Sequence, residues 1–195
     1  MKTSHFFAYL SRMKFIRRWG LMRNTMPENI QEHSLQAALI AHGLAVIRNV
    51  HCGGNADPSR AATLAMFHEV SEVFTGDMPT PVKYFDPQIK AVYGNIEHLA
   101  REKLHGMLPP EIAAVYEPML FPQAADAGLW QLVKAADKLC AYLKCAEELK
   151  AGNQEFAAAA KGILAELDSM DLPEVRYFLR VFAPSFSLSL DELNE

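Results

Sequence analysis

A histidine and two acidic residues lie close together near the middle of the chain, at the end of an apolar run. Glu69 directly follows His68, and Glu72 comes four residues after the histidine. Side chains four residues apart share one face of an α-helix. Imidazole and carboxylate groups bind metals, and a carboxylate beside a metal can also orient water. The segment therefore indicates metal-dependent chemistry, although a plain contact between His68 and Glu72 near a helix end has the same spacing.

The segment after this group carries polar residues suited to an anion such as phosphate. It begins with a sharp break at Gly76-Asp77 and then places Thr80 and Lys83 among prolines. Each proline pushes the preceding residue towards an extended conformation. We therefore predict that residues 77–83 do not form a regular helix.

Two further candidates lie on apolar helical faces elsewhere in the chain. His33 is aligned with Ala37, Ile40 and later apolar residues, where a lone histidine is usually part of the core. Asp137 borders the apolar face of a later helix, and a buried carboxylate without a partner is costly. Lys134 or Lys138 are possible partners only if the side chain turns outward, and a bound cation is the alternative.

An arginine pair followed by tryptophan ends the first helical segment, at Arg17-Arg18-Trp19. Cations are common at helix C-termini, where the helix dipole favours them. The alternative is a phosphate clamp, with Trp19 as a stacking surface. Spacing alone favours the first interpretation.

Two other metal patterns are weaker. His68 to Glu72 resembles the zinc-peptidase pattern H-E-x-x-H, but the second histidine is replaced, which removes one nitrogen ligand. His98, Glu102 and His105 have chelating spacing, but the charges around them indicate a solvated helix face.

The elements that must position these residues are all predicted to be helical. Alanine, leucine, glutamate and methionine are common, and alternating β-branched runs are scarce, which favours an all-α fold. Asn29, Asp57 and Asp86 are predicted N-caps. The expected helices cover residues 4–16, 29–50, 57–68, 86–105, 109–118, 128–150, 154–167 and 172–182. The tail alternates apolar residues with serine, and we expect it to be extended. We expect one domain over residues 1–195.

Composition excludes several classes of protein. The 195 residues carry a net charge of −4, which does not favour binding to nucleic-acid polymers. No apolar run approaches the roughly 18 residues of a membrane span. Three cysteines give no disulfide framework and indicate a reducing compartment. The first 27 residues carry six positive charges and no acid, as in an organellar transit peptide, but they lack the apolar core of a secretory signal. We predict a cytoplasmic protein.

His33 in Glu-His-Ser, His68-Glu69 at a helix end, and Asp137 in Lys-Ala-Ala-Asp-Lys-Leu together resemble the HD-domain superfamily of metal-dependent phosphohydrolases. In that family a histidine, a His-Asp doublet and a distant aspartate converge on one divalent cation. Three segments, HFFAYLSRMKFIRRWGLMRN, EVFTGDMPTPVKYF and PSFSLSLDEL, also resemble the bacterial 5′-deoxynucleotidases of this superfamily. The resemblance covers nearly the whole chain. It implies a multi-helix HD-domain fold and an enzyme that hydrolyses deoxyribonucleoside 5′-monophosphates to deoxynucleosides and phosphate.

The resemblance also implies roles for particular residues. The cation would be held by His33, His68, Glu69 and Asp137. Cobalt is the first expectation for the metal, and manganese or zinc are alternatives, because mixed imidazole and carboxylate ligands suit such metals. Arg18 would orient the phosphate, Glu72 would be the general acid or base, and Asp77 would contact the sugar. The expected substrate contacts are Arg18, Trp19, His33, Asp77, Thr80, Pro81, Val82, Lys83 and Asp137. Relatives in the family also imply a homodimer.

The sequence departs from the family at one ligand, because Glu69 stands where the family has aspartate. Glutamate offers the same oxygens one methylene further from the backbone. A rival interpretation is therefore a nucleotide-binding HD protein in which Glu69 has weakened or abolished hydrolysis. The presence of Glu72, Arg18 and Asp77 favours an enzyme. A third interpretation is a phosphohydrolase acting on a cyclic dinucleotide or a nucleoside triphosphate.

Overall fold

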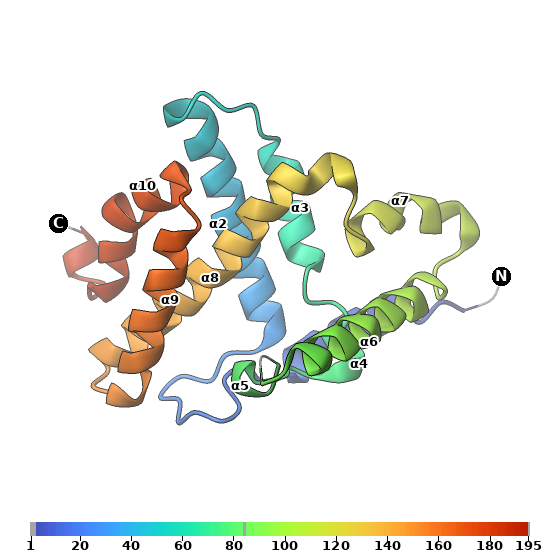
Figure 1. The fold of residues 1–195 in the computed structure, drawn as a ribbon, viewed down its shortest axis with the longest axis horizontal. Helices are drawn as coiled ribbons and strands as arrows, with labels where there is room; N and C mark the ends of the chain where they lie inside the picture. Colours follow the sequence, from blue (N-terminus) through green and yellow to red (C-terminus); the bar gives the residue numbers. More distant parts are fainter. Residues whose placement is uncertain (1–2, 84, 195) are drawn as a thin grey trace.

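The computed structural model describes residues 3–83 and 85–194, and they form a bundle of helices (Figure 1). The α-helices are α1 (Phe6–Leu10), α2 (Ile30–His51), α3 (Pro58–Phe67), α4 (Glu72–Thr75), α5 (Thr80–Lys83), α6 (Pro87–His105), α7 (Pro110–Leu120), α8 (Ala127–Lys150), α9 (Ala157–Ser169) and α10 (Pro173–Val181). Short 3-10 helices are η1 (Ser11–Phe15), η2 (Ala124–Asp126), η3 (Gln154–Phe156), η4 (Ala183–Ser187) and η5 (Glu192–Asn194). Within the described ranges there is no β-strand, and the prediction of an all-α fold is confirmed.

The predicted caps start three of the longer helices. The Asn29 side chain accepts hydrogen bonds from the backbone N–H groups of Gln31 and Glu32, and Glu32 completes a capping box. Asp57 and Asp86 cap α3 and α6, each with a proline in the first turn. These local signals fix where α2, α3 and α6 begin, and therefore where the residues at their ends lie.

The main core forms where α8 crosses α2 and α3, with α9 and α10 packed around them (Figure 1). The apolar face predicted for α2 is buried from Ala37 to Ile47, and His33 lies on the same face with its side chain fully buried. Leu132, Leu139 and Leu143 supply the buried face of α8. His33 and Asp137 are thus brought together by the packing of two long helices.

A second hydrophobic cluster forms around the N-terminal segment. It joins the N-terminal segment to α6 and α7 through Phe6, Met13, Ile30, Leu104 and Leu120. Val70, in the turn after α3, also belongs to it. The turn that carries His68 and Glu69 therefore runs between the two clusters.

Several predicted boundaries were wrong. Residues 77–83 include a short helix, α5, because Val82 and Lys83 both donate to the Pro79 carbonyl and Pro81 lies in the first turn, where its missing N–H costs nothing. Helix α7 continues through Pro118 to Leu120, since a proline in the last turn removes only one helical hydrogen bond.

The two ends of the chain also differ from the predictions. The first helical segment divides into α1 and the 3-10 helix η1. The tail forms η4 and η5 instead of an extended strip. Its serines bond locally, for example the Ser187 hydroxyl to the Pro184 carbonyl and the Ser189 N–H to Glu192, and such bonds favour turns.

Among the helices of the described chain, none combines the length and apolarity needed to cross a bilayer.

Candidate metal centre and adjoining cavity

Four side chains from three parts of the fold converge at one point. His33 comes from the first turns of α2, His68 and Glu69 from the turn after α3, and Asp137 from the middle of α8. One ligand atom from each lies within 4.8 Å of the others. His33 Nε2 is 3.1 Å from Asp137 Oδ1, and His68 Nε2 is 3.4 Å from Glu69 Oε1. Glu69, despite its extra methylene, reaches the same point as the other three ligands.

The histidine nitrogens at this point lack hydrogen-bond partners. His33 Nε2 and His68 Nε2 are buried without a hydrogen bond, and so is His33 Nδ1, which faces Glu28 on the other side of its ring. The other nitrogen of His68, Nδ1, lies 2.5 Å from the Ala65 carbonyl, so a proton on Nδ1 would be donated there and Nε2 would be free to bind a metal. Buried polar atoms are rarely left unpaired. Two imidazoles and two carboxylates are a donor set for a first-row divalent metal, so these residues fit a cation.

The charges in the cluster stabilise one another. Burial alone raises the pKa of Asp137, but His33 and His68 outweigh it and hold that pKa well below its usual range. Burial likewise opposes ionisation of Glu69, yet His68 beside it lowers the pKa of Glu69. The two acids are thus ionised at neutral pH, in the form that binds a metal.

Glu72 behaves in the opposite way to Glu69. Burial, the adjacent charge of Glu69 and a hydrogen bond to Glu69 raise the pKa of Glu72 to about 11. One of its oxygens, Oε2, is buried without a partner. Helix α3 stops at Phe67 and residues 68–71 form a turn, so Glu72 lies at the start of α4 and not on a continuation of α3. Burial and the negative charge of Glu69 therefore favour the protonated form of Glu72 beside the ligand cluster.

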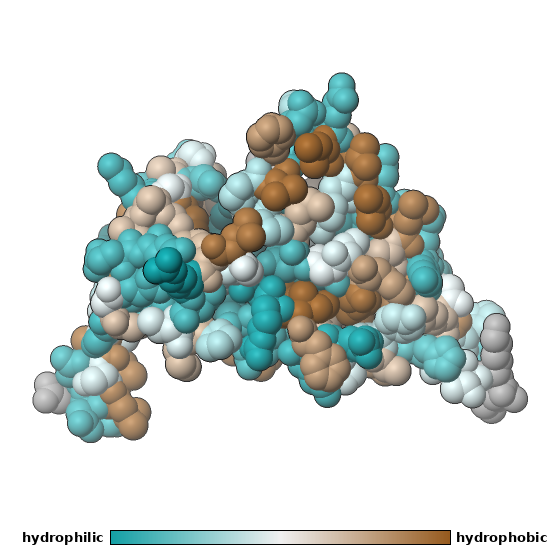
Figure 2. All heavy atoms as spheres, turned by 90° about the horizontal axis from the view of Figure 1, so that it is seen from below, coloured by the Kyte–Doolittle hydropathy of each residue, from teal (hydrophilic) through white to brown (hydrophobic). Residues whose placement is uncertain are grey.

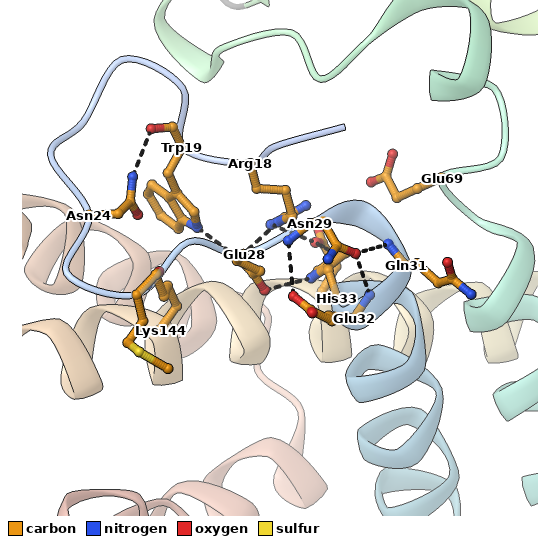
Figure 3. Close-up of polar contacts among 12 residues, drawn as sticks. Arg18, Trp19, Asn24, Glu28, Asn29, Gln31, Glu32, His33, Glu69 and Lys144 are labelled. Carbon is orange, nitrogen blue, oxygen red and sulfur yellow. Dashed lines mark hydrogen bonds and ion pairs between the residues drawn. The ribbon is translucent and has the colours of Figure 1, made fainter. Parts of the chain in front are cut away.

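Arg18 is held over the cluster by the start of α2. An isolated antiparallel bridge pairs Arg17 with Asn29, and the Arg18 N–H donates to the Glu28 carbonyl. The Arg18 guanidinium points towards Glu28 (Figure 3), and its Nε lies 3.3 Å from Glu28 Oε2. Its Nη2 lies 3.9 Å from Asp137 Oδ1. Burial disfavours its charge, but Asp137 and Glu28 outweigh that effect and raise the pKa of Arg18. A permanent cation therefore stands beside the cluster.

A cavity of about 540 Å³ opens directly beside Arg18 and Asp137. Its walls are the segment Arg18–Met22, the segment around Asp77, α8 and α9. Trp19 lines it in a left-handed backbone conformation, with φ at 59°, and packs 5.3 Å from the Phe156 ring. A bulky residue in this conformation is strained and is held there by its surroundings. The cavity is large enough for a nucleoside-sized molecule.

The predicted substrate residues divide into two groups. Asp77, Thr80 and Pro81 line the cavity with Arg18 and Trp19. Val82 and Lys83 are outside its described lining, and the Lys83 ammonium instead lies 2.9 Å from Glu97 on α6. The short helix α5 turns these two side chains away from the cavity.

Several site residues were missed in the sequence. Glu28 contacts both Arg18 and His33, but nothing in the sequence distinguishes it from any acid before an N-cap. Helix α9 forms one wall through Ala159, Gly162, Ile163 and Glu166, and its composition gave no such signal. Lys138 pairs with Glu166 and not with Asp137, whose partners are His33, His68 and Arg18.

The other candidate chelating residues, His98, Glu102 and His105 on α6, form separate contacts away from the ligand cluster. His98 and Glu102 lie 3.5 Å apart on an exposed face, and the His105 ring bonds to the Ala113 carbonyl. His98 and Glu102 confirm the solvated face expected there, whereas His105 is half-buried.

Comparison with known families and proteins gives consistent matches. Residues 5–186 match the family described as 5′-deoxynucleotidase YfbR-like. A 5′-deoxynucleotidase of Vibrio parahaemolyticus is 54% identical over 194 residues, covering 100% of both chains. The 5′-deoxynucleotidase YfbR of Shigella boydii is 53% identical over 195 residues, covering 100% of this chain and 98% of the relative.

Solved structures with the same fold are more distant in sequence. An HD-domain phosphohydrolase from Listeria innocua superposes with a TM-score of 0.81 at 21% identity, covering 97% of this chain and 92% of the other. The HD phosphohydrolase DatZ of cyanophage S-2L, bound to dA and one catalytic Zn²⁺ ion, superposes with a TM-score of 0.64 at 22% identity, covering 96% and 98%. These likenesses confirm the expected HD-domain fold.

Proposed function

The chain belongs to the YfbR-like 5′-deoxynucleotidase family, and we propose that it is a metal-dependent phosphomonoesterase that converts deoxyribonucleoside 5′-monophosphates to deoxynucleosides and phosphate. One observation of the structure carries the proposal. A four-residue ligand cluster, with buried nitrogens that lack partners, shares Asp137 and the Arg18 cation with a nucleoside-sized cavity.

We assign the metal to His33, His68, Glu69 and Asp137. A divalent cation bound there supplies a Lewis acid that draws charge from the phosphoryl group and lowers the pKa of a water molecule. Cobalt, manganese and zinc all suit these ligands, and cobalt remains our first choice. The convergence of Glu69 with the other ligands argues against a site weakened by the replacement of aspartate.

The other residues act on the phosphate, the proton and the nucleoside. Arg18 presents a planar guanidinium that can bind two phosphate oxygens at once and offset charge that develops on them. Glu72 acts as the general acid or base. As water attacks phosphorus and the bond to the 5′-oxygen breaks, the water loses a proton and the 5′-oxygen gains one, and the Glu72 carboxyl handles this transfer. Trp19 packs on the nucleoside, and Asp77 contacts the sugar in the cavity.

Thr80 and Pro81 complete the cavity wall in this proposal, whereas Lys83 contributes by holding the α5 segment against α6 through Glu97. Val82 follows Pro81 on α5 and lies outside the described lining of the cavity. The site draws on both hydrophobic clusters, which supports one functional domain over the whole chain.

The proposal includes a cytoplasmic homodimer. The three cysteines are free, in keeping with a reducing compartment. Helix α6 exposes an apolar stripe of Ile89, Val92, Ile96 and Leu99, at alternating spacings of three and four residues that suit pairing with another helix. Hydrophobic and hydrophilic patches are mixed over the side of the molecule that carries α6 (Figure 2). Light scattering should give twice the chain mass, and a monomer at micromolar concentration would contradict this part.

The enzyme assay uses protein stripped of metal and reloaded with cobalt, manganese or zinc. We expect phosphate release from dAMP with at least one metal and much slower release from AMP. A Glu69→Asp variant, run in parallel, should retain activity and change at most the metal preference. Absence of release from every deoxynucleoside monophosphate with every metal would refute the proposal. Activity that appears only in Glu69→Asp would favour the rival, a nucleotide-binding protein with lost hydrolysis.

A further inference from the structure

One carboxylate, Glu28, contacts the metal cluster and the substrate residues at the same time. Its Oε2 atom accepts hydrogen bonds from Trp19 Nε1 at 3.1 Å and Arg18 Nε at 3.3 Å. Its Oε1 atom lies 3.7 Å from His33 Nδ1. Figure 3 shows Glu28 between these three side chains. The exposed fraction of the Glu28 side chain is 13%, so little solvent screens these contacts.

The backbone fixes Glu28 in this place. It directly precedes the N-cap Asn29, and its carbonyl accepts the Arg18 N–H at 3.0 Å. The neighbouring bridge from Arg17 to Asn29 and the bond from the Ile30 N–H to the Ile16 carbonyl continue the same pairing. The side chain therefore projects from a short paired segment and not from a loose loop.

The chemistry of the three neighbours explains why this position needs a carboxylate. Trp19 Nε1 and Arg18 Nε carry protons and can only donate. His33 Nε2 lies 3.1 Å from Asp137 Oδ1 in the ligand cluster, so we assign the role of metal ligand to Nε2. The ring proton then belongs on Nδ1, which is 3.7 Å from Glu28 Oε1, a distance of electrostatic attraction that is longer than a hydrogen bond. All three neighbours are thus donors, and both oxygens of Glu28 must accept. An amide cannot satisfy them all, because its NH₂ group would face either His33 or the Arg18–Trp19 pair.

We propose that Glu28 is a positioning residue that sets the His33 tautomer for metal binding and, with its second oxygen, orients Arg18 and Trp19 for the nucleotide. The inference rests on the proposed function, and it adds a shared support for the two halves of the site. Carboxylates behind metal-bound histidines commonly contribute about ten- to a hundredfold in metal affinity.

The test compares Glu28→Gln with two controls in metal-free protein. Glu32→Gln changes an exposed acid of the same helix start, and Thr25→Val loosens the 20–27 loop without facing His33. Calorimetric titration with Mn²⁺ alone measures metal affinity. Long-range ¹H–¹⁵N NMR of the histidine rings reports which His33 nitrogen carries the proton, and thermal melts report folding.

We expect Glu28→Gln to weaken Mn²⁺ binding by about ten- to a hundredfold, to change the His33 tautomer, and to raise the KM for dAMP. Both controls should keep the wild-type Mn²⁺ affinity and tautomer. A Glu28→Asp variant, which still only accepts, should retain the tautomer and bind Mn²⁺ more tightly than Glu28→Gln.

Mn²⁺ affinity within twofold of wild type in Glu28→Gln, or an unchanged tautomer, would overturn the inference. An equal loss in Thr25→Val would also overturn it, because loop order and not His33 would then be responsible. If wild-type protein bound no Mn²⁺ and released no phosphate, the proposed function would fail, while the tautomer measurement would still decide the role of Glu28.

Discussion

A buried ion pair on α8 ties down the loop that carries Arg18 and Trp19, and its removal should be strongly destabilising. Glu148 has an exposed fraction of 1%, and its carboxylate accepts hydrogen bonds from Lys144, Asn153, the Thr25 N–H and hydroxyl, and the Met26 N–H. Lys144, also buried, donates in addition to the Met26 carbonyl. Both charges therefore hold the backbone of residues 25–26.

The perturbation is Glu148→Ala, which leaves the Lys144 ammonium buried without its partner. Breaking a buried pair in this way costs about 3–5 kcal/mol. For a chain of this size each kcal/mol lowers the Tm by about 2–4 °C, so the Tm should fall by about 6–20 °C. The adjacent, exposed Glu147 offers the matched control, and Glu147→Ala should change the free energy of unfolding by less than about 0.5 kcal/mol.

Replacement of both charges tests the reason for the loss. Lys144→Met with Glu148→Leu removes the unpaired charge and should recover part of the stability. Both Glu148→Ala and this double variant leave the N–H groups of Thr25 and Met26 without an acceptor. The loop should therefore be looser and the KM for dAMP higher than in the wild type in both variants.

The same pair predicts a dependence on pH. Burial raises the pKa of Glu148, but Lys144, Asn153 and Thr25 outweigh it and hold that pKa well below the ordinary value of 4.5. A carboxyl with a lower pKa in the folded state stabilises the fold above its unfolded pKa and loses this effect as the pH falls. Wild-type stability should therefore fall more steeply below about pH 4.5 than that of Glu148→Gln.

Urea unfolding and calorimetry measure these effects. A Tm loss below about 2 °C for Glu148→Ala would refute the reasoning, since it corresponds to less than about 1 kcal/mol. Equal losses for Glu147→Ala and Glu148→Ala would show that helix composition, and not the buried pair, is responsible.

Two further substitutions test the assigned chemistry. Glu72→Gln should leave Mn²⁺ and dAMP binding near wild type. It should lower kcat by about 10²–10⁴-fold, because it removes the carboxyl that transfers a proton. Unchanged steady-state turnover would remove Glu72 from the mechanism. Arg18→Lys should lower kcat/KM by about ten- to a hundredfold, since a hydrogen bond to a charged group is worth about 1.5–3 kcal/mol, and an equal loss in the exposed neighbour Arg17→Lys would contradict a specific phosphate contact.

Sequence patterns predicted the helices whose signals are local. The caps at Asn29, Asp57 and Asp86 and the face from Ala37 to Ile47 depend on residues within a few positions of one another, and all were confirmed. The prediction that residues 77–83 contain no helix was wrong, because proline is tolerated in the first turn of a helix.

The site itself was predicted in part. His33, His68, Glu69 and Asp137 were identified by resemblance, and the structure brings them together. Glu28 and the α9 wall were missed because they become part of the site only through tertiary packing. The position of Lys83 depends on Glu97, fourteen residues later on α6, and no local pattern connects the two.

The central claim is that one divalent metal, held by His33, His68, Glu69 and Asp137, enables this chain to hydrolyse deoxynucleoside monophosphates. Stepwise addition of Co²⁺ to metal-free protein, with phosphate release from dAMP followed at each step, tests it most directly. We predict that activity is absent without metal, rises linearly with added Co²⁺ and reaches a plateau at one equivalent per chain. Asp137→Asn should abolish the rise. Full activity in the metal-free protein, or a Co²⁺-dependent rise that is unchanged in Asp137→Asn, would contradict it.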